Sequence, residues 1–67
     1  MTSLYHVTCS VHDLEGVFLA TEVARVVASS RSQAGTLAAD NVRQRHHGGV
    51  RVKAVSIVRL SGRAKMA

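Results

Sequence analysis

Residues 30–49 read SRSQAGTLAADNVRQRHHGG and predict a helix together with both of its ends. Ser30 followed by Gln33 matches a capping box, in which each residue's side chain bonds backbone N–H groups at the start of a helix. Residues then recur at helical spacing on one face: Ala34, Leu37, Ala38, Val42 and Arg45. Because this stripe consists mostly of alanine, we expect the helix to lie close against a sheet.

Two adjacent glycines mark the predicted end of this helix. Gly48 and Gly49 are expected to take the left-handed backbone of a helix cap, which residues with a Cβ resist. Four cationic or titratable residues fall in the last turn, where positive charge complements the helix dipole: Arg43, Arg45, His46 and His47. Gly35, counted with the polar face, costs helix propensity and can mark a close contact.

Alternating residues predict a strand over residues 4–11. One side carries Tyr5, Val7, Cys9 and Val11, and the other carries His6, Thr8 and Ser10. Residues 12–16 form a turn built on Asp13 and Gly16. Residues 17–28 are predicted to be a second strand that pairs back on the first, with a bulge because their alternation is imperfect. A helix over residues 13–28 is the alternative, and the β-branched content argues against it.

A third strand is predicted over residues 50–60. One face carries Val50, Val52, Ala54, Ser56, Val58 and Leu60, and the other carries Arg51, Lys53, Val55, Ile57 and Arg59. The fold class is therefore α+β: a small β-β-α-β domain with an antiparallel hairpin, a third strand and one helix packed on one face of the sheet. If the second and third strands are neighbours, the connecting helix makes them parallel.

The chain has 67 residues, so we expect one domain over residues 1–67, with residues 61–67 as a mobile basic tail. A domain of this size exposes much of its surface, and one Phe, one Tyr and no Trp leave a thin core. One helix covers one face of the sheet and leaves the other to water or a partner. We therefore expect a homodimer, with Val55 and Ile57 at its contact.

Charge is distributed unevenly along the chain. All four acidic residues lie within the first forty, while seven basic residues and no acid follow: Arg43, Arg45, Arg51, Lys53, Arg59, Arg63 and Lys65. Such asymmetry is typical of proteins that bind nucleic acid or another polyanion. We expect these seven side chains to form one continuous positive patch that binds a partner or nucleic acid.

Catalysis, metals and cofactors have little support in the sequence. No Ser, His and acid stand in a recognisable catalytic frame, and Cys9 is expected to be a buried structural thiol. His46 and His47, with His6 and His12, are the best metal candidates, but adjacent histidines on a helix point in different directions. We therefore predict no enzyme activity, no metal, no cofactor and no small-molecule substrate, with the histidines at the helix end contacting its last carbonyls.

The cysteine content, the apolar runs and the N-terminal sequence indicate where the protein is located. A lone cysteine suits a reducing compartment. No apolar run approaches the roughly 20 residues that cross a membrane, and the N-terminus lacks the pattern of a signal peptide. We expect a cytoplasmic protein that does not bind membranes.

Three segments carry a resemblance to small phage proteins: Val26–Ala34, Leu37–Ala38 and His47–Val50. In those proteins a strand ends in a small residue and a Ser cap, an alanine-rich helix follows, and a Gly turn leads to the last strand. The chain is similar to one compact basic group of anti-CRISPR proteins that act on type I surveillance complexes. The same pattern occurs in archaeal ribosomal proteins of similar topology, and the resemblance is confined to the C-terminal two-thirds of the chain.

This resemblance implies a steric inhibitor that sits on the Cas backbone subunits of a CRISPR–Cas effector complex in the host cytoplasm. Its basic side chains would block or divert target DNA without catalytic residues, and no specific contact residue is carried over. The alternative is a non-sequence-specific nucleic-acid-binding module, ribosome-associated or phage-structural. No aromatic residue lies among the basic residues, so stacking on the nucleobases of a single strand is not expected. The third strand also lacks the Asn or Gln that would read the edges of base pairs.

Overall fold

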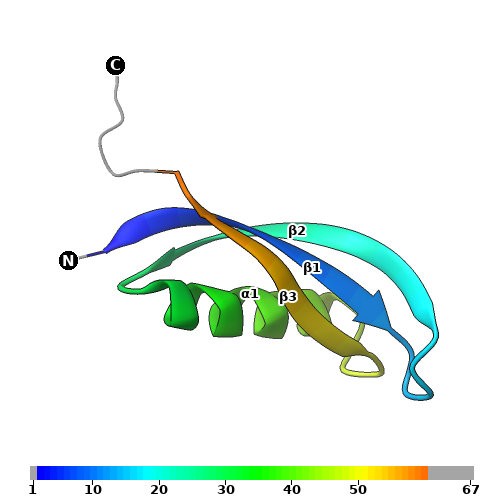
Figure 1. Cartoon of the computed structure of the whole chain (residues 1–67). Helices are drawn as coiled ribbons and strands as arrows, with labels where there is room; N and C mark the ends of the chain where they lie inside the picture. The colour runs from blue at the N-terminus through cyan, green and yellow to red at the C-terminus, as the bar shows by residue number, and fades with distance from the viewer. Residues whose placement is uncertain (1, 61–67) are drawn as a thin grey trace.

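A computed structural model describes residues 2–60 as strand, strand, helix, strand (Figure 1). The elements are β1 (Ser3–His12), β2 (Phe18–Ala28), α1 (Arg31–Arg45) and β3 (Arg51–Arg59). α1 lies along one face of a curved antiparallel sheet. The predicted α+β class and β-β-α-β order are confirmed. The predicted mobile tail, residues 61–67, lies outside the described residues.

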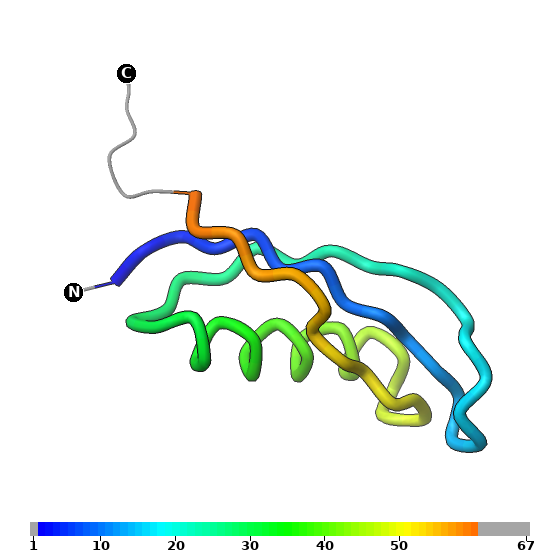
Figure 2. Tube along the Cα trace, in the orientation of Figure 1, coloured from blue at the N-terminus to red at the C-terminus, as the bar shows by residue number. Residues whose placement is uncertain are grey.

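β1 is the central strand of the sheet, whose order is β2-β1-β3. β2 and β3 are therefore not neighbours, and the parallel pairing considered for them does not occur. The hairpin places β2 on one side of β1, and α1 then crosses beneath the sheet so that β3 joins the other side. Figure 2 shows the consequence: the β1–β2 turn and the α1–β3 loop lie at the same end of the molecule.

The hairpin follows the predicted turn chemistry. The Asp13 carboxylate accepts hydrogen bonds from the backbone N–H groups of Glu15 and Val17, both at 2.9 Å, and Gly16 takes a φ of +93°. β2 pairs with β1 along its whole length, so the alternative helix over residues 13–28 is wrong. The predicted bulge is confirmed, because Val11 pairs with Ala20 and His12 with Phe18, which leaves Leu19 as the extra residue.

The core lies between the sheet and α1 and is made mostly of small side chains, with Tyr5 as a buried aromatic residue. Every second residue of β1 is buried as predicted: Tyr5, Val7, Cys9 and Val11. Ala and Val residues from the other elements complete the core: Ala24, Val26, Ala28, Ala34, Ala38, Val42 and Val50. The largest fully buried side chains are valines and one cysteine, so the helix axis can approach the sheet closely.

The predicted capping box is present at the start of α1. The Ser30 hydroxyl accepts a hydrogen bond from the Gln33 N–H at 3.1 Å. The Gln33 Oε1 accepts from the Ser29 N–H at 2.6 Å and from the Ser29 hydroxyl at 2.8 Å, so the reciprocal bond reaches one residue further back than expected. These bonds connect the end of β2 directly to the first turn of the helix.

The helix ends one residue earlier than the glycines predicted. His47, rather than a glycine, enters the left-handed region first with a φ of 58°, and Gly48 follows with a φ of 78°. The Gly48 N–H donates to the Arg43 carbonyl at 3.0 Å, which satisfies one of the free carbonyls at the helix end.

The buried face of α1 differs from the predicted stripe. Gly35, predicted on the polar face, is buried against the sheet, whereas Leu37, predicted on the apolar stripe, is 41% exposed. A Cβ added at Gly35 would lie 3.1 Å from Ile57 Cδ1 and 3.7 Å from Ala54 Cβ. The missing side chain therefore gives β3 room to pack against the helix, and this contact outweighs the helix propensity that glycine costs.

β3 changes register against β1 at a second bulge. Thr8 pairs with Ser56 while Cys9 pairs with Ala54, so Val55 is an extra residue. The extra residue reverses the alternation that follows it, because side chains in a strand change face at every position. Ile57 therefore turns toward α1 and is partly buried.

We predict that Ser30→Ala lowers the free energy of unfolding by about 1 kcal/mol, because it removes the acceptor for an N–H at the start of α1. Ser30→Asp keeps an acceptor at this position and is expected to retain stability close to the original. Urea denaturation followed by circular dichroism measures both. Equal losses in the two variants would contradict this assignment of the cap.

Candidate functional site

The side of the sheet that faces away from α1 is the candidate functional site, and we call it the open face. Its side chains follow from the strand pairing, because residues directly opposite one another point to the same side. Taken across β2, β1 and β3, they form five rows: Val27, Leu4 and Leu60; Arg25, His6 and Val58; Val23, Thr8 and Ser56; Thr21, Ser10 and Lys53; Phe18, His12 and Arg51.

The open face divides into two chemically different halves. The apolar half consists of Leu4, Val23, Val27, Val58 and Leu60, whose exposed fractions lie between 37% and 61%. The basic half, toward the β1–β2 turn, contains Ser10, His12, Thr21, Arg51 and Lys53, and also the exposed Phe18, whose ring lies edge-on to that of His12. Arg25 and His6 lie in the same row as Val58, beside the apolar side chains. A surface of this kind offers both hydrophobic contact and hydrogen bonds to an anion.

No carboxylate of residues 2–60 lies on the open face. Asp13 and Glu15 belong to the turn beyond the end of the sheet, and Asp40 lies on α1. Glu22 pairs with Cys9 and therefore points to the α1 side. The three cations of the face, Arg25, Arg51 and Lys53, are all exposed and make no ion pair within the described chain.

Of the seven basic residues predicted to form one patch, the five that lie within residues 2–60 do not share one surface. Arg51 and Lys53 share the open face, but the bulge at Val55 places Arg59 opposite Tyr5 on the α1 side. The prediction that Arg59 shares a face with Arg51 and Lys53 is therefore wrong. Val55 is 57% exposed at the bulge, and its predicted role in self-association stays a prediction.

The two predicted cations of the helix, Arg43 and Arg45, do not join this surface. Arg43 pairs with Asp40 on the outside of α1, and Arg45 pairs with Glu22. The prediction of one continuous patch is therefore wrong for these helix residues. Arg63 and Lys65 lie outside the described residues. Ile57, predicted at a dimer contact with Val55, is partly buried against the core, and its role in self-association stays a prediction.

Arg25 is a functional candidate that the charge count of the C-terminal half missed. It stands alone between buried Ala24 and Val26 in β2 and pairs with His6 of β1. The sequence could have indicated this position, because side chains of a strand alternate between its two faces. An arginine between two residues of the buried face must point to the exposed face.

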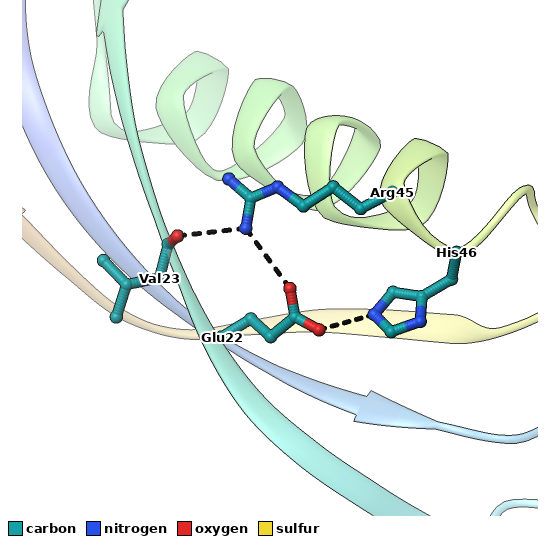
Figure 3. Close-up of polar contacts among 4 residues, drawn as sticks. All are labelled: Glu22, Val23, Arg45 and His46. Carbon is teal, nitrogen blue, oxygen red and sulfur yellow. Dashed lines mark hydrogen bonds and ion pairs between the residues drawn. The ribbon is translucent and has the colours of Figure 1, made fainter.

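The end of α1 is tied to β2 by a polar cluster on the opposite side of the sheet (Figure 3). Arg45 Nη1 donates to Glu22 Oε1 at 3.2 Å and to the Val23 carbonyl at 3.3 Å. His46 Nε2 lies 2.5 Å from Glu22 Oε2. The His46 side chain therefore contacts this carboxylate, whereas the sequence predicted a contact with the last helix carbonyls. The hydrogen bond with His46, reinforced by Arg45, lowers the pKa of Glu22.

Cys9 and the histidines do not assemble into a reactive centre. Cys9 is fully buried, and burial raises the pKa of its thiol, which disfavours the reactive thiolate. His6 and His12 lie on the open face, whereas His46 lies on the α1 side. Within residues 2–60, no three His, Cys, Asp or Glu residues are grouped as metal ligands, and no helix is long and apolar enough to cross a membrane.

No protein-family model, curated protein or solved structure matches the chain. The assignment of a function therefore depends on the geometry and charge of the open face, together with the resemblance seen in the sequence.

We predict that acidification weakens the fold through Glu22. Its pKa is lower in the folded than in the unfolded chain, so its stabilising contribution is present above its ordinary value near 4.5 and is lost as the pH falls through the folded value. Glu22→Gln should reduce the loss of unfolding free energy between pH 6 and pH 3. Urea denaturation at a series of pH values tests this, and identical pH profiles for the two proteins would contradict it.

Proposed function

We propose that this protein is a non-enzymatic inhibitor of a type I CRISPR–Cas effector complex in the cytoplasm of a host cell. It docks on the complex through the open face and blocks target DNA binding. The observation that carries the proposal is that one uncovered sheet face combines exposed apolar side chains with three cations and no carboxylate among the described residues.

The apolar half favours a protein partner. Val27 is 61% exposed and Val58 is 49% exposed, on a face that no helix of the described chain covers. Contiguous exposed apolar residues rimmed by polar ones are typical of protein–protein contacts, whereas a phosphate backbone gains little from them. A protein subunit covering this half would remove these side chains from water.

The basic half suits the other component of such a complex. Arg51 and Lys53 lie two residues apart on one strand, before the bulge, and so project to the same side. Ser10 and Thr21, in the row of Lys53, add hydroxyl donors that can bond phosphate oxygens. An inhibitor seated by its apolar half would thus hold cations where they can capture target-DNA phosphates or pair with acidic side chains of a subunit.

A second function is supported by the basic half alone, namely non-sequence-specific binding of nucleic acid. Salt dependence separates the two proposals. For a protein that simply binds duplex DNA, each neutralised phosphate contributes about 0.9 to the slope of log affinity against log salt. An inhibitor that buries its apolar half against a subunit is expected to keep most of its affinity for the complex as the salt concentration rises.

We predict that the double variant Arg51→Glu with Lys53→Glu weakens binding to purified type I surveillance complex roughly tenfold or more, because two favourable charges become repulsive. The matched control is Arg31→Glu with Arg59→Glu. It changes net charge equally at exposed positions that lie outside the open face. Affinity is measured by biolayer interferometry with the complex and, in parallel, with a bare DNA duplex.

Each outcome of this comparison is informative. Loss of affinity for the complex in the first variant alone supports the proposed docking face. Equal losses in both variants would show that binding depends on net charge and not on the open face. Tight binding to bare DNA with no binding to the complex would replace the inhibitor proposal by the nucleic-acid alternative.

A further inference from the structure

A three-stranded sheet has two edge strands, and their protection differs along their length. Unpaired edges attract additional strands, and proteins commonly block them with bulges and charged side chains. β3 is interrupted by the bulge at Val55 and carries Arg51 and Lys53 before it. β2 has its bulge at Leu19, and Arg45 covers the Val23 carbonyl. Residues 24–28 of β2 carry neither a bulge nor such a cover.

The backbone of this unprotected stretch faces outward at alternate residues. The Val23 carbonyl is directed away from β1, since it accepts from Arg45 of α1. On the other side of β1, the Leu4 carbonyl accepts a hydrogen bond from the Leu60 N–H at 2.8 Å. The backbone polar groups of Leu4 therefore point toward β3 and not toward Val27 of β2. Both observations give the same phase, and the N–H and C=O groups of Arg25 and Val27 therefore point to the free edge.

A groove runs beside this edge, between β2 and α1. It is lined by residues 25–27 of the strand and by Leu37, Asp40, Asn41 and Gln44 of the helix. Leu37 is 41% exposed there, which explains why it does not join the core. The Asn41 and Gln44 side chains make no hydrogen bond within residues 2–60 and are available to a ligand.

We propose that residues 24–28 of β2 and the adjoining groove of α1 form a strand-addition site for an extended acidic peptide segment of a partner protein. The added strand would exchange backbone hydrogen bonds with Arg25 and Val27. Alternate side chains would then enter the groove over Val26 and Leu37. This site adjoins the open face, with which it shares the Arg25 and Val27 side chains, and it does not rest on the proposed function.

Charge selects an acidic peptide over a second copy of the chain. The protein carries a net charge of +5, and Arg25 has no ion-pair partner within the described residues, while Asp40 is already paired with Arg43. In a two-fold pairing of β2 strands centred on Val26, the two Arg25 side chains would share a face about 7–8 Å apart, which is repulsive. A glutamate-bearing strand at the same edge would instead meet Arg25 favourably.

The test is an NMR titration of the labelled protein with a synthetic hexapeptide of alternating valine and glutamate, acetylated and amidated at its ends. We expect the backbone amide signals of Arg25 and Val27 to shift together with the side-chain amides of Asn41 and Gln44. The same peptide with alternate backbone nitrogens methylated cannot complete the ladder. It should bind about tenfold more weakly, as expected from the loss of two hydrogen bonds.

A pair of variants places the binding in the groove. Leu37→Glu is expected to weaken the unmodified peptide several-fold, while Thr36→Glu, with the same charge change on an exposed helix position outside the groove, should not. Absence of shifts at millimolar peptide, or equal binding of the methylated peptide, would overturn the proposal. Concentration-dependent shifts of the same signals without peptide would overturn it in favour of a second copy.

Discussion

The close packing of α1 against the three strands of the sheet holds this structure together. Ala34, Ala38 and Val42 share one core with the valines of the central strand, and the missing side chain of Gly35 leaves room for Ile57 of β3. Apart from Tyr5, the core consists of alanines, valines and one cysteine, so its stability depends on close packing of many small contacts. Any residue that pushed the helix outward would loosen every one of these contacts at once.

That packing also decides what each face of the sheet can do. The charged residues around α1 are largely used internally, since Glu22, Arg45 and His46 tie the helix end to β2 and Asp40 pairs with Arg43. All of these groups lie on the helix side or on the helix itself. Within residues 2–60 the cations of the open face have no carboxylate partner, and this is the physical basis for proposing that the face meets a partner.

The local patterns of the sequence were sufficient to predict the order of the strands and the helix, but not the side of the sheet to which every side chain points. The alternation from Tyr5 to Val11 and the pairing of Ser30 with Gln33 depend on neighbours in the chain, so they could be predicted. The side of the sheet to which residues 55–59 point could not be predicted, because Val55, Ile57 and Val58 are apolar in both phases and the pattern does not mark the bulge that turns Ile57 toward Gly35. Arg59 was misplaced for this reason, while Arg25 could have been found from strand phase alone.

Site-specific photo-crosslinking can show whether the protein meets its partner with the open face. A benzophenone amino acid is placed at Thr8, in the middle row of the face, and in a second protein at Thr36, on the exposed side of α1. With purified type I surveillance complex and target DNA, we expect crosslinks to a Cas subunit or to DNA from position 8 and none from position 36. Crosslinks from position 36 alone would contradict it.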